Sequence, residues 1–214
     1  FFDEYRLFSA GLMITATIGR TGGDQLAAQL KAHVISETEI DATIAAITYP
    51  QESTPLFQSQ LDLLKIGVAV QGQVLKNESI DRTLGSWLET YGHIPINFCE
   101  DPWILTDAKS QLEQLLRTSC EKAYAEAVNG HAARIASAKV QLEKINNSSI
   151  TTLAHAVAEA TYLNEYRKNL FSWVSLAFRP AFTEIAAMAG SSNWRDCFYL
   201  MPEEMLACVQ GQVI

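Results

Sequence analysis

The chain has 214 residues, of which 48% are hydrophobic and 19% charged, and its 24 acidic residues outnumber its 16 basic ones to give a net charge of −8. This length and composition indicate a folded globular chain, not a disordered one. The basic residues form no stripe that could neutralise a phosphate backbone, which excludes nucleic-acid binding, and no apolar run reaches the roughly 20 residues that span a bilayer.

The first residues, FFDEYRLF, lack an initiator Met and carry acidic side chains where a secretory signal would carry basic ones. We therefore expect a cytoplasmic segment that is excised from a larger multidomain chain. The cysteines are widely separated and show no C-x-x-C spacing, so neither a zinc site nor a disulfide framework is indicated. Reduced and mostly buried thiols are expected at Cys99, Cys120, Cys197 and Cys208.

The first third of the chain has helical periodicity interrupted by a glycine-rich stretch. A helix is predicted from Phe1 to about Gly19, followed by a break at GRTGGD and a second helix from Asp24 to about Val34. The glycines also suggest a phosphate-binding loop, but Asp24 stands where a Walker loop needs lysine. The helix break is the preferred interpretation.

Capping signals place the next helices. Ser36 and Glu39 have capping-box spacing and predict a helix that ends before Pro50. Thr54 followed by proline predicts another helix, which reaches about Gly72. A further helix is indicated by apolar residues at helical spacing, which are Ile80, Leu84, Trp87 and Tyr91.

A loop with two prolines, GHIPINFCEDPW, divides the chain near its middle. After it, Thr106 is expected to cap a long helix that pauses at Asn129-Gly130 and closes at the NNSS turn. A second long helix is predicted from Ile150 toward Ala189, kinked at Pro180. Its inward residues are expected to be Leu163, Tyr166, Leu170 and Val174.

These elements predict an all-α fold. We expect an irregular helical bundle with a long antiparallel helix hairpin, followed by a short extended segment and a C-terminal helix. The bundle is interpreted as one helical domain over residues 1–214, with two subregions, 1–105 and 106–214, as the alternative division. No repeat of 20 to 50 residues supports a solenoid.

Metal and nucleophile chemistry find no support in the sequence. The four histidines are scattered and none belongs to an H-E-x-x-H or E-x-x-H arrangement. His155 and Glu159 share a helix face, but that spacing is common on solvated helices. There is no G-x-S-x-G motif, so a self-contained active site is not expected.

The helix after Ile150 carries the polar and aromatic candidates. Arg167 and Arg179 could bind a phosphoryl group or its acceptor through the planar guanidinium, with Tyr166 and Trp173 lining a pocket together with Phe178 beside the segment from Trp87 to Trp103. Lys168 and Arg195 are further basic candidates on or beside this helix. The alternative is that all four basic residues lie along the surface or form ion pairs with Glu165, Glu184 or Asp196.

The C-terminal stretch RDCFYLMPEEMLACVQGQ resembles the segment of the form D-[IV]-F-Y-L-T-x-[DE]-E-L that ends the helical region of phosphoenolpyruvate-utilising phosphotransferases. These include phosphoenolpyruvate synthase, pyruvate phosphate dikinase and rifampicin phosphotransferase relatives. Cys197 replaces the aliphatic position, and Met201-Pro202 replaces the threonine turn. The matching residues are Asp196, Phe198, Tyr199, Leu200, Glu203, Glu204, Leu206 and Gly211.

Three further blocks resemble the same region. FQSQLDLLKIG (57–67) looks like one of its helices, and EYRKNLFSWVSLAFRPAF (165–182) fits the long helix before the signature. WLETYGHIPINFCEDPW (87–103) is similar to its "KYgWIP…Y.G.PW" element through Tyr91, Gly92, Ile94, Pro95, Pro102 and Trp103.

The resemblance implies a helical region between an ATP-grasp domain and a swivelling phosphohistidine domain of the same chain. ATP and Mg²⁺ are implied for the parent enzyme and no cofactor for this segment, which lacks both catalytic domains. The region would position a small-molecule acceptor, as the helical region of rifampicin phosphotransferases does. The alternative is a purely structural or protein-interaction bundle without a ligand.

Overall fold

The computed structural model describes residues 2–33, 36–96 and 100–211. Within these ranges the chain is helical and contains no strand, which confirms the all-α prediction. In chain order the elements are α1 (Phe2–Ala32), α2 (Glu37–Ile47), α3 (Pro55–Gln71), α4 (Asn77–Tyr91), α5 (Leu105–Leu116), α6 (Cys120–Ile145), α7 (Ser148–Met188), the 3-10 helix η1 (Trp194–Tyr199) and α8 (Pro202–Val209).

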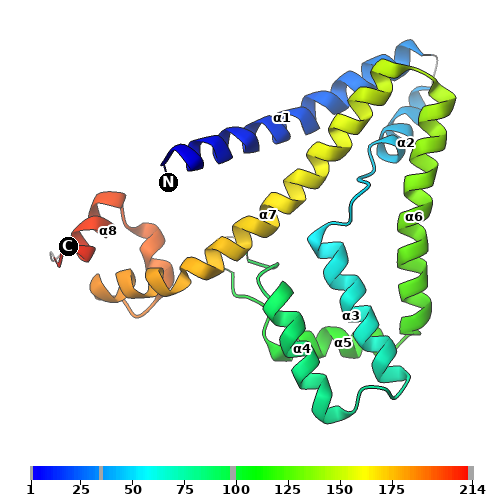
Figure 1. Cartoon of the computed structure of the whole chain (residues 1–214). Helices are drawn as coiled ribbons and strands as arrows, with labels where there is room; N and C mark the ends of the chain where they lie inside the picture. Colours follow the sequence, from blue (N-terminus) through cyan, green and yellow to red (C-terminus); the bar gives the residue numbers. More distant parts are fainter. Residues whose placement is uncertain (1, 34–35, 97–99, 212–214) are drawn as a thin grey trace.

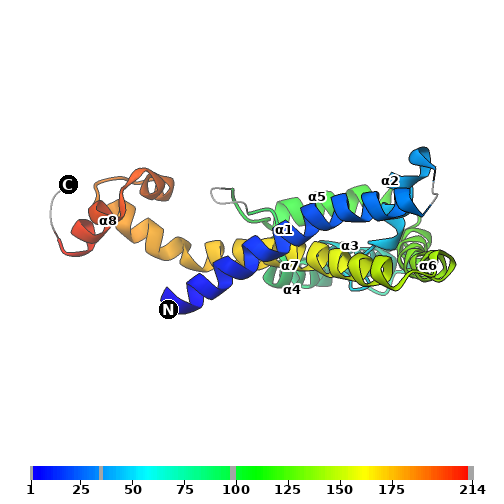
Figure 2. The ribbon, with the colours of Figure 1, turned by 90° about the horizontal axis from the view of Figure 1, so that it is seen from above.

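The helices form an open triangle with an arm (Figure 1). α6 and α7 diverge from the turn that joins them, and α3, α4 and α5 lie between them at the wide end of the triangle. α1 runs antiparallel along the outer side of α7, while η1 and α8 lie at the far end of α7. Seen from above, the arrangement is flat (Figure 2).

One hydrophobic cluster forms where α1, α2, α6 and α7 meet at the tip of the triangle. Its buried residues include Leu30 of α1, Ile47 of α2, Leu142 of α6 and Ile150 of α7. A second cluster joins α3, α4 and α5 and includes Trp87, whose indole nitrogen donates to the carbonyl of Ser59 at 3.0 Å. The described residues therefore form two separate hydrophobic clusters.

The predicted helix break at GRTGGD is wrong, because α1 runs without interruption through it and Asp24 caps nothing. Gly22 is buried where α1 approaches α7, and a Cβ at this position would lie 2.5 Å from Cγ2 of Val157. The glycine permits close helix contact, so tertiary packing outweighs the low helix propensity of the stretch.

The boundaries of the fifth and sixth helices also differ from the prediction. α5 begins at Leu105, and its first turn is capped by the Asp107 carboxylate, which accepts from the backbone N of Ile104 at 2.9 Å, so Thr106 is not the cap. The break falls before Ser119, whose hydroxyl accepts from the backbone N of Lys122. α6 then continues through residues 129 and 130 without a pause.

Other local signals are confirmed. Thr54 accepts from the backbone N of Phe57 at the start of α3. In the NNSS turn, Asn146 adopts the left-handed conformation with φ 48°, and the side chain of Asn147 caps α7. α7 contains Pro180 and ends at Met188, close to the predicted end. Ser36 lies at the N-cap of α2, but its side chain makes no capping hydrogen bond.

The predicted inward face of the long helix is wrong for three of its residues. Leu163, Tyr166 and Val174 are 38%, 47% and 36% exposed, respectively. The reason is that α6 diverges from α7 instead of packing along it, so the two helices form a splayed hairpin. None of the described helices combines the length and apolar character that crossing a membrane requires.

The cysteine prediction is confirmed for the thiols within the described ranges. Cys120, Cys197 and Cys208 are free and buried, whereas Cys99 lies outside the described residues. Cys120 begins α6 and packs against Gly67 of α3, where a Cβ would lie 2.6 Å from Cys120 Sγ and 3.2 Å from its Cβ. α3 and α6 are therefore in backbone-to-side-chain contact at this point.

Gly67→Ala is expected to destabilise the fold by about 1–3 kcal/mol, because the added methyl overpacks a fully buried contact. Gly85→Ala is the matched control, since this glycine lies inside α4 and a Cβ there meets nothing within 4 Å. The control should gain up to about 1 kcal/mol from helix propensity. Urea unfolding followed by circular dichroism measures both, and equal stabilities would contradict the close α3–α6 contact.

Candidate functional site

One face of α7 docks onto the loop between α4 and α5. Asn169 and Ser172 lie about one turn apart on this face. His93 is buried, and its Nε2 lies 2.9 Å from Oδ1 of Asn169. The Ser172 hydroxyl is also buried and donates to the carbonyl of Ile96 at 2.5 Å. The loop is thus held to α7 by polar contacts whose groups are removed from water.

The base of this loop is closed by residues of the YG…PW motif. The backbone N of Trp103 donates to the carbonyl of Gly92 at 2.8 Å. A Cβ on Gly92 would lie 2.6 Å from the carbonyl oxygen of Leu88, so no other residue fits without a backbone shift. Trp103 then stacks on Trp87, with ring centroids 5.4 Å apart. These motif positions determine the shape of the loop.

Farther along α7, Arg179 binds the end of the same loop. Its Nη2 donates to the carbonyl of Glu100 at 2.7 Å, and its Nη1 donates to Oδ1 of Asp101 at 3.2 Å. The Arg179 side chain is only 16% exposed. The planar guanidinium can make both contacts at once, which a lysine ammonium cannot do with the same geometry.

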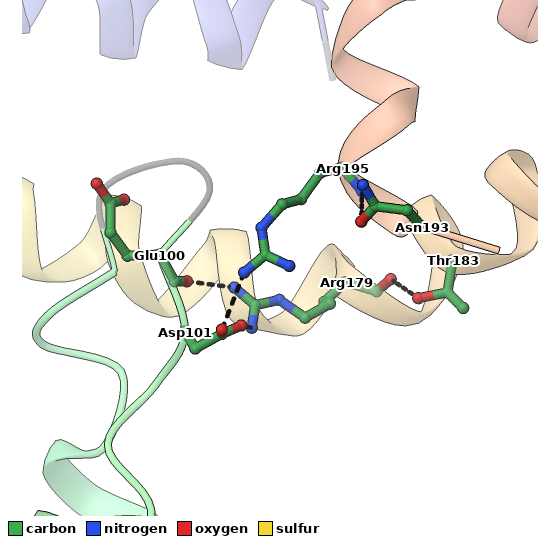
Figure 3. Close-up of polar contacts among 6 residues, drawn as sticks. All are labelled: Glu100, Asp101, Arg179, Thr183, Asn193 and Arg195. Atoms are coloured by element: carbon green, nitrogen blue, oxygen red, sulfur yellow. Dashed lines mark hydrogen bonds and ion pairs between the residues drawn. The ribbon is translucent and has the colours of Figure 1, made fainter. Parts of the chain in front are cut away.

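Arg195, the second residue of η1, binds the same aspartate. Arg195 Nη2 donates to Oδ2 of Asp101 at 2.9 Å, so one carboxylate joins two arginines (Figure 3). Both guanidinium groups also lie over the Trp194 ring, at 4.2 Å for Arg179 and 4.7 Å for Arg195. We call these four residues the Asp101 cluster. With two arginines and one aspartate, it carries a net positive charge.

Asp196, the first residue of the C-terminal signature, stabilises the turn that leads into η1. Its carboxylate accepts from the side-chain amide of Asn193 at 3.1 Å and from the Ser191 hydroxyl. Cys197 follows, fully buried, with its thiol 2.8 Å from the carbonyl of Phe182, and burial raises the pKa of this thiol. Phe198 packs on Phe182 with ring centroids 5.4 Å apart.

The departure at Met201-Pro202 is compensated within the chain. Pro202 occupies the first position of α8, and the Glu204 carboxylate accepts from the backbone N of Met201 at 2.7 Å. This contact supplies half of a capping box without a hydroxyl at the N-cap. Gly211 follows α8 with φ +73°, a conformation that favours glycine.

The other predicted site residues lie apart from this cluster. Tyr166 and Trp173 are on an exposed face of α7, at 47% and 53% exposure, and Phe178 is 49% exposed. Tyr166 stacks on Tyr162, with centroids 6.1 Å apart, and Arg167 is half-buried. A role for Arg167, Tyr166 and Trp173 in substrate binding stays a prediction.

The acidic partner of the arginines was missed by sequence reasoning. Arg179 pairs with Asp101, 78 residues away, and not with Glu165, Glu184 or Asp196. The only signal in the sequence was an aspartate beside the Pro-Trp pair that closes the loop. The predicted ion pairing on α7 itself holds for Lys168, whose ammonium lies 2.7 Å from Glu165.

The described residues contain no group of three or more His, Cys, Asp or Glu side chains that could hold a metal ion. Comparison with protein-family models, with curated proteins and with solved structures returns no match for this chain. The arrangement of the Asp101 cluster suits anchoring or the recognition of an anion, since arginine binds carboxylates and phosphates with the same geometry.

Arg179→Lys should lower the free energy of unfolding by about 1 kcal/mol, because lysine keeps the charge but loses the stacked, two-acceptor geometry. Acrylamide should also quench tryptophan fluorescence more strongly in this variant, since Trp194 loses a covering guanidinium. Arg167→Lys on the same helix serves as the control and should change neither quantity. An identical response of both variants would contradict a structural role for Arg179.

Proposed function

We propose that this chain is the helical region of a phosphoenolpyruvate-utilising phosphotransferase, acting between an ATP-grasp domain and a swivelling phosphohistidine domain. The observation that supports the proposal best is that two motifs of the resemblance, far apart in the sequence, meet in space. The loop within 87–103 contacts the segment that begins the C-terminal signature through Asp101 and Arg195.

Several residues that match the family pattern have a structural role in this chain. Gly92 and Trp103 close the loop, Asp196 stabilises the turn into η1, and Glu204 caps α8. A chain that merely resembled the family in composition would have no reason to use these positions in this way. This agreement between motif and geometry adds to the support from the contact between the two motifs.

In such an enzyme the chain would provide binding and positioning, and the neighbouring domains would provide the phosphoryl chemistry. ATP and Mg²⁺ would bind the ATP-grasp domain, not this region. Arg167, Tyr166 and Trp173 are proposed to contact a small-molecule acceptor from the exposed face of α7. The enzyme would act in the cytoplasm, where ATP and phosphoenolpyruvate are available.

A purely structural or protein-interaction role is the second candidate. One observation favours it: the two terminal nitrogens of Arg179 donate to Asp101 and to the Glu100 carbonyl, and so serve an internal contact. Under this alternative the helices space the other domains and bind no ligand. The two candidates differ in what they predict for the exposed residues of α7.

Labelling tests the family assignment. The full-length polypeptide that contains this chain should acquire acid-labile label from radioactive ATP or phosphoenolpyruvate, because phosphohistidine is unstable in acid. The isolated 214-residue chain should acquire none, since it has no phosphate-cradling loop. Absence of label on the full-length polypeptide, or stable transfer to a histidine of the isolated chain, would contradict the proposal.

Substitution of the three proposed acceptor contacts on α7 separates the two candidate roles. In the full-length enzyme, Tyr166→Ala, Trp173→Ala and Arg167→Ala should each lower kcat/KM for the acceptor by about tenfold, the loss expected for one good ligand contact. The helical fold should survive the tyrosine and tryptophan replacements, because both side chains are exposed. Circular dichroism checks the fold of the Arg167 variant, since that side chain is half-buried. Phosphohistidine formation measures the steps that precede acceptor binding and should not change. Unchanged kcat/KM in all three variants would favour the structural role.

A further inference from the structure

A cleft opens where α6 and α7 diverge from their shared turn. It has a volume of about 650 Å³, within the range of roughly 300–1,000 Å³ that is typical of small-molecule sites. Its apolar floor is formed by Ile47 at the end of α2, Leu142 of α6 and Ala158 of α7. All three side chains are buried, so the floor of the cleft is part of the hydrophobic core.

Polar side chains surround this floor. Lys139 and Glu143 line it from α6, four residues apart, and His155 lines it from α7. Tyr49, in the segment after α2, contributes an aromatic wall that is held in place from behind. Its hydroxyl lies 2.8 Å from His131 Nδ1, and the Arg134 guanidinium lies over its ring at 5.4 Å.

A second, smaller hollow of about 270 Å³ continues the cleft along α7. The two hollows share Gln51, His155 and Ala158 as lining residues. The second adds Tyr162 and the two carboxylates of Glu52 and Glu159. Burial raises the pKa of the Tyr162 phenol, and the neighbouring carboxylates raise it further, so this hydroxyl stays a neutral donor and acceptor at pH 7.

The combined lining is acidic. Glu52, Glu143 and Glu159 supply three negative charges and Lys139 supplies one positive charge, which leaves −2 when His155 is neutral. Among the ion pairs of the described residues, none involves these three glutamates. Glu143 and Glu159 thus have no cationic partner within the described ranges, while Glu52 accepts a hydrogen bond from the Tyr162 hydroxyl and keeps its negative charge. The apolar floor argues against a hydrated metal ion as the ligand.

We propose that this cleft binds a small amphipathic organic cation, an amine attached to an aromatic or aliphatic hydrocarbon group. The hydrocarbon part packs on Ile47, Leu142 and Ala158, while the ammonium group faces the glutamates of the rim. The cleft lies at the start of α7, whereas the Asp101 cluster lies near its end. The proposal for the cleft therefore does not depend on the proposed enzyme family.

Three probes of similar size and different charge test the site: 4-phenylbutylamine, 4-phenylbutanol and 4-phenylbutyrate. Isothermal titration calorimetry with the 214-residue chain should give saturable binding of the amine with a millimolar or lower Kd, as expected for a ligand of this size. The amine should bind about tenfold more tightly than the alcohol, and the carboxylate should bind most weakly. Equal affinities for the three probes, or no saturable binding of the amine, would overturn the proposal.

Two variants of α6, one that removes a negative charge and one that removes a positive charge, test whether the amine binds in the cleft. Glu143→Gln should weaken amine binding about threefold, and Lys139→Gln should tighten it by a similar factor, because each changes a single charge at the rim. Glu126→Gln is the control, since Glu126 lies on the same helix outside the cleft and is exposed. It should leave the affinity unchanged.

A blocking variant tests the floor separately from the charge. Ala138 lines the cleft from α6 and is partly exposed, so Ala138→Phe should fill the cleft and abolish binding of both the amine and the alcohol. Circular dichroism confirms that the variant is folded. If Glu143→Gln and Lys139→Gln shift the affinity in the same direction, or if folded Ala138→Phe binds the amine normally, the cleft is not the site.

Discussion

The direction of the second half of α7 depends on its polar docking to the loop between α4 and α5. Within the described helix, Ser172 and Ala186 are the only buried residues beyond Ala160. The fully buried apolar side chains of α7 are therefore concentrated in its first part, at the tip of the triangle. Hydrogen bonds to the loop orient the helix. The Ser172 hydroxyl could turn back to the carbonyl of Lys168, but loss of the docking would leave the buried His93 ring and the carbonyl of the buried Ile96 unpaired, which costs more than each bond contributes.

This docking also connects the two hydrophobic clusters. The cluster at the tip includes the start of α7, and the cluster of α3, α4 and α5 lies beneath the loop. A second connection lies on the other side of the triangle, where Gly67 of α3 contacts Cys120 of α6. Two small cores linked at two points explain how a chain with 48% hydrophobic residues can still form an open triangle instead of one compact core.

Signals that act within a few residues could be predicted from the sequence, whereas those that depend on distant neighbours could not. The Thr54 cap and the NNSS turn are local hydrogen-bonding patterns, and both are present. The GRTGGD stretch was misinterpreted because the need for glycine at position 22 comes from its close contact with Val157 of another helix. Asp101 could not be assigned to Arg179 for the same reason, since nothing in a single sequence brings together side chains 78 residues apart. The exposed face of α7 was assigned inward because a hairpin turn does not specify the angle between its two helices.

Because α7 is long, a small change in its tilt moves its far end by a large distance. A helix of 41 residues spans about 60 Å, so a tilt of about 5° at the tip of the triangle would displace the far end by about 5 Å. The segment from η1 to α8 is carried at that far end. Asp101 binds Arg179 near this end of α7 and Arg195 just beyond it. Because its carboxylate is exposed, salt or competing anions can weaken both ion pairs.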